Sequence, residues 1–269
     1  MCYESEAAEL VRRLAEASTT GPPLGLLSVS IYDTAWVSMI SKVRGGSRHW
    51  LFPSSFSRIL ETQSQQGGWE HGVSDVDGIM NSMAALLAIK WHQKNISNLS
   101  CSALPTNLDH RVLCAVGWLN TKLENWDIQN SDQVGFEILI PSLLLLLQQE
   151  NITFQFPASR HLALLNATKL SKFDPHMLYT SEKNTLLHSL EAFTGLVDFD
   201  KISHHIVQGS MMASPSSTAA YLICASRWDD DAEAYLQRAY QHGAGLGTGG
   251  FPGAYPTTLF ETTWVCLKN

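Results

Sequence analysis

The chain has 269 residues, of which 45% are hydrophobic and 16% are charged, and this composition is typical of a globular protein with a large core. Its formal net charge of −7 argues against nucleic acid as a partner, because phosphate backbones are bound by basic surfaces. No apolar run reaches the roughly 18 residues of a membrane-spanning helix, so no transmembrane segment is expected. Five widely spaced cysteines and an acidic start, Met1–Glu6, without signal or transit character predict a cytoplasmic protein.

Helical periodicity dominates the chain. Apolar residues spaced at i, i+3 and i+4 or short apolar runs predict helices over 7–17, 32–40, 56–63, 81–92, 112–123, 136–149, 186–193, 216–226, 232–241 and 258–267. Alternating β-branched segments are scarce, and we therefore expect an all-α fold. Gly45 and Gly46 form the first strong break and a candidate domain boundary.

A turn rich in glycine or serine leads three times into a helix that opens on small residues. The three turns are Gln63–Trp69, Gly209–Pro215 and Gly249–Pro256. Helical hairpins that cannot bury their apolar faces alone must stack on each other, and a closed ring of them is an α-α barrel. The alternative is an irregular helical domain with ordinary glycine turns.

The segment Met212–Leu222 illustrates this pattern most clearly. Ser214 or Ser216 can cap a helix that starts at Pro215, since serine oxygens accept hydrogen bonds from free amides and proline suits the first helical turn. The acidic run Asp229–Asp231 is interpreted in the same way, as charge at a helix N-terminus rather than a metal site. Ser74–Gly78 resembles the start of a calcium loop but lacks its later acids, and we expect a solvated turn.

Four carboxylates surround one expected loop. They are Glu124, Asp127, Asp132 and Glu137, and convergent carboxylates of this kind can hold Mg²⁺ beside phosphate oxygens. The alternative is a polar loop followed by a negatively charged helix start.

Three basic residues are further candidates. His188 stands between apolar neighbours, which favours a buried structural histidine over a catalytic base. Lys169 and Lys172, as lysines, would ordinarily face solvent.

Several segments, in the same order along the chain, resemble class II diterpene cyclases, the copalyl diphosphate synthases. The segments are Tyr32–Val37, Phe52–Ser55, Gln63–Trp69, Val134–Glu137, Pro141–Leu143, Leu186–Glu191, Ser214–Ala219 and Pro256–Glu261. Two further stretches look most like the fungal bifunctional copalyl diphosphate/ent-kaurene synthases, namely Met211–Leu222 and Trp228–Ala232. Jointly, these matches cover almost the whole chain.

The resemblance implies two helical barrel domains, β and γ, that enclose geranylgeranyl diphosphate between them. Residues 1–48 would start the β domain, and residues 49–269 would form the γ domain. The family's enzymes protonate the terminal alkene of this substrate and cyclise it to a copalyl-type diphosphate. Their acid lies in a DxDD motif, which the 269 residues do not contain. We therefore expect an N-terminal part of such an enzyme, inactive without the missing β-domain segment.

The resemblance also implies roles for the candidate residues. The acids that would hold Mg²⁺ and the diphosphate are Glu124, Asp127, Asp132 and Glu137, and the basic segment that meets the diphosphate contains Lys169 and Lys172. His188 matches a histidine that works with an asparagine to take the final proton in plant enzymes. That asparagine aligns with Gly253, so the pair is incomplete in this chain.

Two other functions stay open. The chain is alternatively a non-catalytic helical scaffold that pairs with a separate catalytic domain. A weaker alternative is another α-α barrel enzyme such as a glycoside hydrolase, which needs two carboxylates about 5–10 Å apart across one cleft. The position of the acidic loop argues against this last class.

Overall fold

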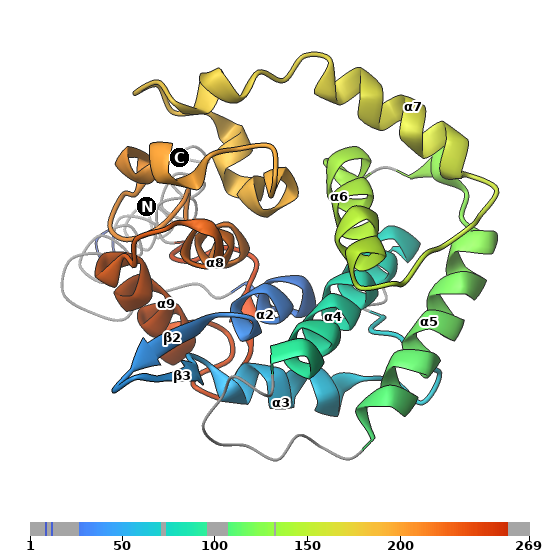
Figure 1. Ribbon diagram of the computed structural model, residues 1–269, viewed down its shortest axis with the longest axis horizontal. Helices are drawn as coiled ribbons and strands as arrows, with labels where there is room; N and C mark the ends of the chain where they lie inside the picture. The colour runs from blue at the N-terminus through green and yellow to red at the C-terminus, as the bar shows by residue number, and fades with distance from the viewer. Residues whose placement is uncertain are drawn as a thin grey trace.

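The computed structural model describes Glu9, Arg12 and the ranges 27–70, 74–95, 107–131 and 133–257. Within these residues the chain is mainly helical (Figure 1). The expected helices 7–17 and 258–267 lie outside the continuous described ranges. No helix in the described part is both long and apolar enough to cross a membrane.

The elements are as follows. The α-helices are α2 (Ile31–Ser38), α3 (Pro53–Thr62), α4 (Asp75–Asn95), α5 (Leu108–Glu124), α6 (Phe136–Gln149), α7 (Ser159–Leu170), α8 (Pro215–Cys224) and α9 (Asp230–His242). The 3₁₀ helices are η2 (Ile128–Asn130), η3 (Pro175–Leu178), η4 (Thr185–Phe193), η5 (Phe199–Lys201) and η6 (Ser203–His205). The short strands are β1 (Val29–Ser30), β2 (Ser41–Arg44), β3 (Ser47–Trp50) and β4 (Phe251–Pro252).

Five helical elements form a closed inner ring. Helix α2 packs on α4, α4 on α6, α6 on η4, η4 on α8, and α8 again on α2. Helices α3, α5, α7 and α9 lie outside this ring, each against an inner neighbour (Figure 1). Helix α8 is buried from Pro215 to Leu222. As expected from their small size, Ala219 and Ala220 allow the neighbouring helices to pack closely against α8. The ring is the expected α-α barrel.

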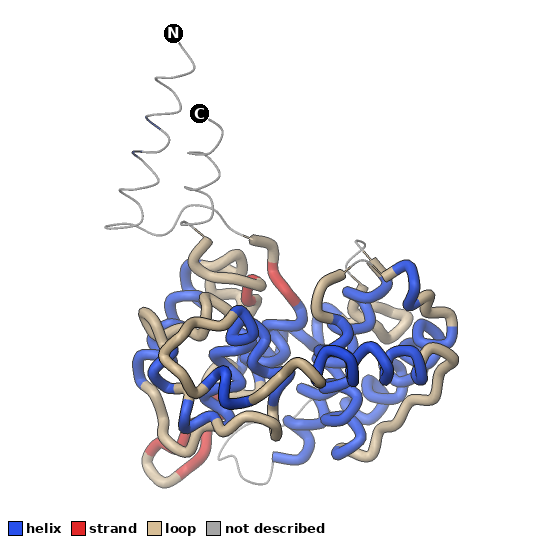
Figure 2. Tube along the Cα trace, turned by 90° about the horizontal axis from the view of Figure 1, so that it is seen from above, coloured by secondary structure: helices blue, strands red, loops and turns tan. Residues whose placement is uncertain are grey.

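The first and last described segments of the barrel are joined by a short sheet. Strand β1 pairs antiparallel with β4, with Val29 opposite Pro252 and Ser30 opposite Phe251 (Figure 2). The side chain of Thr34 accepts a hydrogen bond from the backbone N–H of Phe251 at 2.9 Å. Residues near 29 and near 252 therefore lie side by side, as the ends of an inserted domain would.

The region before the expected boundary at residue 48 is part of the same core. Helix α2 contacts α3, α4 and α8, and its residues Ala35, Trp36 and Val37 are buried with theirs. Gly45 and Gly46 form the turn of the β2–β3 hairpin, with φ of +58° and +80°, which matches the glycine preference of two-residue hairpin turns. The predicted division between 1–48 and 49–269 stays a prediction.

The local expectations had mixed outcomes. The solvated turn expected at Ser74–Gly78 was wrong, because this segment begins α4 and the Ser74 hydroxyl accepts a hydrogen bond from the Asp77 N–H at 3.2 Å. The helix-capping interpretation of Asp229–Asp231 is confirmed, because Asp229 accepts hydrogen bonds from two amides at the start of α9. The expected helix 186–193 is a 3₁₀ element, η4, with a kink at Ser189.

Candidate functional site

A buried polar cluster lies where three inner elements of the barrel meet. Asp33 comes from the first turn of α2, Glu191 from η4, and Ser216 from the first turn of α8. Each residue belongs to a segment that resembles diterpene cyclases, and the segments are far apart in the sequence. The fold therefore gathers three separate motifs at one place.

Asp33 caps α8 from a neighbouring helix. Its carboxylate accepts hydrogen bonds from the backbone N–H of Ser216 at 3.1 Å and from the Ser30 hydroxyl at 2.7 Å. The residue is 5% exposed. Burial raises the pKa of Asp33, while the hydrogen bonds from Ser30 and Ser216 and the charge of His188 act in the opposite direction. A carboxylate suits this position because a helix N-terminus carries partial positive charge.

Three hydroxyl groups surround the carboxyl group of Glu191. Its carboxyl oxygens lie 2.8 Å from the Ser217 hydroxyl, 3.1 Å from the Tyr32 hydroxyl and 3.3 Å from the Ser216 hydroxyl. The residue is 2% exposed, and burial raises its pKa to about 7. Burial and the charge of Glu191 also raise the pKa of Tyr32 well above its ordinary value.

The backbone beside the cluster is strained. Met212 and Ala213, directly before the cap of α8, have φ of +51° and +58°. Residues other than glycine rarely adopt this left-handed backbone conformation. Such outliers cost about 1–3 kcal/mol each and gather at functional sites. The carbonyl of Ala213 accepts a hydrogen bond from the Tyr255 N–H at 2.8 Å, so this loop is tied to the segment near Gly253.

Gly253 and His188 are two further candidate positions. A Cβ atom on Gly253 would lie 3.7 Å from Asp33 Oδ2 and would meet no other group within 4 Å, so space is open beside the carboxylate. His188 is exposed on η4, and its charge only partly opposes the rise that burial causes in the pKa of Asp33. The expectation of a buried structural histidine was wrong, because the His188 side chain faces solvent.

The four carboxylates of the candidate metal site have different surroundings. Glu124 is exposed at the end of α5, and Asp132 lies outside the described residues. Asp127 caps η2 and accepts hydrogen bonds from the Gln129 N–H and the Asn130 side chain. In the described part of the chain, no group of three or more histidine, cysteine or acidic residues is placed to hold a metal ion. The metal assignment stays a prediction.

The fold brings two of the candidate residues, Glu137 and Lys169, into contact. Glu137, at the start of α6, lies 3.2 Å from the ammonium of Lys169 on the neighbouring α7. Glu137 also accepts a hydrogen bond from the Gly135 N–H at 3.1 Å. Lys172 is exposed just beyond α7. A single carboxylate beside a lysine fits Mg²⁺ only as one ligand among phosphate oxygens and waters.

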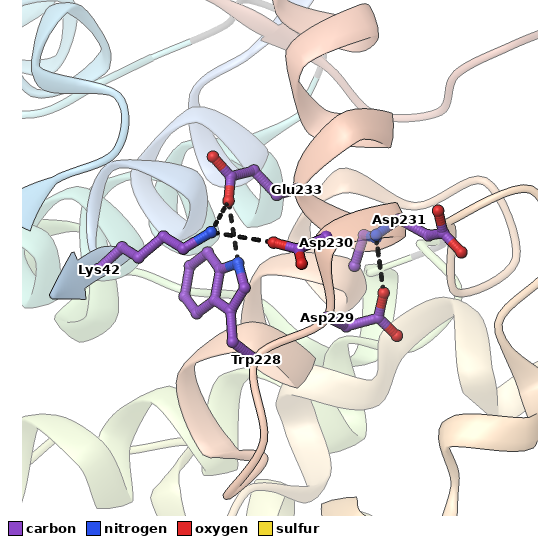
Figure 3. Close-up of polar contacts among 7 residues, drawn as sticks. Lys42, Trp228, Asp229, Asp230, Asp231 and Glu233 are labelled. Carbon is purple, nitrogen blue, oxygen red and sulfur yellow. Dashed lines mark hydrogen bonds and ion pairs between the residues drawn. The ribbon is translucent and has the colours of Figure 1, made fainter. Parts of the chain in front are cut away.

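Asp230, within the acidic run Asp229–Asp231, forms an ion pair with Lys42, as does Glu233 (Figure 3). Lys42 on β2 lies 3.0 Å from Asp230 and 2.5 Å from Glu233, and its ammonium stands 4.7 Å from the centre of the Trp228 ring. The Trp228 indole N–H donates to Glu233 at 2.9 Å. These contacts join the β2–β3 hairpin to α9, which is a structural role.

Sequence reasoning did not single out Asp33 or Glu191 as functional residues. One signal was available, since Glu191 stands within an apolar run, with Leu190 before it and Ala192 and Phe193 after it. If the apolar run is buried, its acid is buried too, and a buried acid needs hydrogen-bonding partners. The sequence does not identify these partners, because Tyr32, Ser216 and Ser217 come from α2 and α8.

No protein-family model matches the sequence. Over 262 residues the chain is 46% identical to pimaradiene synthase pbcA of Emericella nidulans, covering 97% of the chain and 26% of that protein. It is 45% identical over 264 residues to a copalyl diphosphate synthase of Talaromyces verruculosus, covering 98% of the chain and 27% of the relative.

A solved structure shares the fold. The ent-copalyl diphosphate synthase of Arabidopsis thaliana, determined in complex with (S)-15-aza-14,15-dihydrogeranylgeranyl thiolodiphosphate, matches with a TM-score of 0.70 and 27% identity. The match covers 96% of this chain and 35% of that one. The closed ring of helices is thus the helical barrel of a terpene cyclase.

The sequence identities define the family more closely. With 45% and 46% identity to the two fungal enzymes over nearly all its residues, the chain belongs to the diterpene cyclase family. It spans about a quarter of the length of these curated relatives.

Proposed function

We propose that this chain forms one wall of the substrate site in a diterpene cyclase. The reaction would convert geranylgeranyl diphosphate to a copalyl-type diphosphate by protonation-initiated cyclisation. The observation that carries the proposal is the convergence of three family-like segments on the Asp33–Glu191 cluster, next to strained backbone and the exposed His188. The names of the fungal relatives support the substrate class.

The diphosphate end of the substrate would lie near α6 and α7. Lys169 offers a half-exposed ammonium there, and Glu137 holds it in place through their ion pair. Lys172, Glu124, Asp127 and Asp132 would complete the polar surroundings. When bound, Mg²⁺ would neutralise part of the diphosphate charge, with Glu137 as one oxygen ligand.

The initiating acid would come from another part of the cyclase. The 269 residues contain no DxDD sequence, and the matching relatives are about four times as long as the matched region. A β-domain segment is therefore the proposed partner of this barrel. The shared core of residues 27–48 with the later helices supports a barrel that begins before residue 48. A cytoplasmic location is part of the same proposal.

A chimaera tests the function. The matched quarter of the copalyl diphosphate synthase from Talaromyces verruculosus is replaced by this chain, and conversion of geranylgeranyl diphosphate is followed by mass spectrometry of the dephosphorylated product. We expect a bicyclic product. A matched control carries Glu61→Gln, a change at an exposed site on α3. A chimaera that folds, as judged by circular dichroism and its melting temperature, yet forms no cyclic product would contradict the proposal.

A further inference from the structure

The inner elements of the barrel border an apolar cavity toward their C-terminal ends. Its volume is about 240 Å³, and its lining includes Trp36 of α2, Leu87 and Trp91 of α4, Leu146 of α6, Thr194 directly after η4, and Ile223 of α8. The Asp33–Glu191 cluster lies elsewhere, because it contains the first turns of α2 and α8. Along α8, Ile223 lies seven residues beyond Ser216, about 10 Å at 1.5 Å per residue. The apolar cavity is therefore separate from the proposed substrate wall.

A second cavity, which we call the basic cavity, adjoins the apolar one. Its volume is about 380 Å³, and it shares Met39, Trp91 and Ile223 with the apolar cavity. The rest of its lining includes Ser41, Lys42 and Arg48 of the β2–β3 hairpin, and Ser226 and Trp228 from the loop between α8 and α9. Together the two cavities reach the size of small-molecule sites, which begins at about 300 Å³.

Arg48 is the cation that a ligand in the basic cavity would meet. Its guanidinium donates to the Ser41 hydroxyl at 2.9 Å, and no carboxylate in the described part of the chain forms an ion pair with it. Lys42, in contrast, is already paired with Asp230 and Glu233. These two acids outnumber Lys42, so the cavity favours a ligand with one negative charge over a diphosphate. A planar guanidinium matches a carboxylate in shape and charge.

The aromatic wall of the basic cavity is fixed by its own contacts. The Trp228 indole N–H donates to Glu233 at 2.9 Å, and the Lys42 ammonium stands 4.7 Å from the centre of the ring (Figure 3). A wall that is ordered before binding lowers the entropic cost of binding. Met39, at the edge that both cavities share, has a flexible side chain that can adapt to a ligand.

We propose that the two cavities form one binding site for a monocarboxylic acid with an apolar body. The carboxylate pairs with Arg48, and the apolar body lies along Trp91 and Ile223 toward the apolar cavity. Burial of the apolar body supplies most of the affinity, whereas Arg48 selects the charge of the ligand. The site does not depend on the proposed cyclase function.

Calorimetric titration of the 269-residue chain with octanoate, 1-octanol and adamantane-1-carboxylate tests the proposal. Arg48→Gln should weaken octanoate binding about three- to tenfold and leave 1-octanol binding unchanged, because only octanoate carries a charge. The control Arg160→Gln, an exposed change on α7, should leave both affinities unchanged. Tighter binding of octanoate assigns the site to straight-chain fatty acids, and tighter binding of the adamantane compound assigns it to compact cyclic acids.

Alkylation locates the apolar body of the ligand. Cys224 lines the apolar cavity and is accessible to a reagent, whereas Cys114 lies on α5. Octanoate should slow the alkylation of Cys224 by N-ethylmaleimide, measured by peptide mass spectrometry, and leave that of Cys114 unchanged. Cys224→Phe should fill part of the cavity and weaken octanoate and 1-octanol alike. If this variant does not fold, protection of Cys224 in the parent chain reports the same contact.

Four results would overturn the proposal. They are absence of octanoate binding, equal weakening by Arg48→Gln and Arg160→Gln, equal protection of Cys224 and Cys114, and Arg48-dependent binding of geranyl diphosphate that is tighter than that of octanoate. The melting temperature of each variant shows whether it is folded. No turnover is measured, so failure of the chimaera would leave these outcomes intact.

Discussion

Replacing Glu191 by glutamine should change how the stability of the chain depends on pH. The amide has nearly the shape of a protonated carboxyl group. Its oxygen can accept from Ser217 while its NH₂ group donates to the Ser216 and Tyr32 hydroxyls. The substitution therefore keeps the contacts of the cluster but removes the titrating proton. The perturbation is confined to the charge that Glu191 would carry at high pH.

The magnitude follows from the shift in pKa. Burial raises the pKa of Glu191 from 4.5 to about 7. Because the folded-state value is the higher one, the contribution to stability is fully present below pH 4.5 and is lost as the pH rises to about 7. At about 1.4 kcal/mol per pH unit, the loss is about 3 kcal/mol. Glu191→Gln should therefore gain about 3 kcal/mol relative to the parent chain between pH 4.5 and 8.

Urea unfolding followed by tryptophan fluorescence measures this difference. Curves are recorded at pH 4.5, 6, 7 and 8 for the parent chain, Glu191→Gln and the exposed control Glu61→Gln. The control should run parallel to the parent at every pH. The reasoning is refuted if the difference in unfolding free energy between Glu191→Gln and the parent is the same at pH 4.5 and pH 8.

Three further predictions concern other parts of the barrel. Burial lowers the pKa of His92 from 6.5 to about 4. The contribution of the neutral imidazole to folding stability is therefore present above pH 6.5, and about 3 kcal/mol of it is lost as the pH falls through 4. His92→Gln should remove this fall in unfolding free energy at low pH, measured by the same urea titration. Lys169→Gln should raise the KM of the chimaera for geranylgeranyl diphosphate several-fold yet lower stability by less than about 1 kcal/mol, since its ion pair is half-exposed; an unchanged KM would contradict its proposed role. Gly68→Ala would place a Cβ 2.2 Å from the Trp118 ring and should cost about 1–3 kcal/mol in urea, whereas Gly117→Ala, with open space, should stabilise α5 by up to about 1 kcal/mol.

Much of the helical framework could be predicted from apolar spacing. Helix α6 was expected at 136–149, where it is observed, because its long apolar run ends abruptly at polar residues. Helix α7 was not expected, because among Ser159–Leu170 only Leu162 is buried and no apolar stripe marks the helix. In the sequence, Gly45 and Gly46 indicate only a break and a candidate boundary, because a hairpin of short, mostly polar strands has no clear periodic signal.

The site was predictable only in parts. Glu137 and Lys169 were named separately, but their ion pair depends on the packing of α6 against α7, which local patterns do not contain. Asp33 and Glu191 stood within segments of known resemblance, yet their link through Ser216 requires three elements to meet. Burial and the shifted pKa of Glu191 follow from that meeting and not from its sequence neighbours.

Photoaffinity labelling tests most directly whether this wall faces the substrate. The chimaera is incubated with a geranylgeranyl diphosphate analogue that carries a diazirine on its prenyl chain, irradiated, and digested for mass spectrometry. We expect labelled peptides from 184–193, 212–217 or 251–255, with labelling suppressed by excess geranylgeranyl diphosphate. Labelling confined to the outer helices α5 and α9, or labelling that excess substrate does not suppress, would contradict the proposed substrate site.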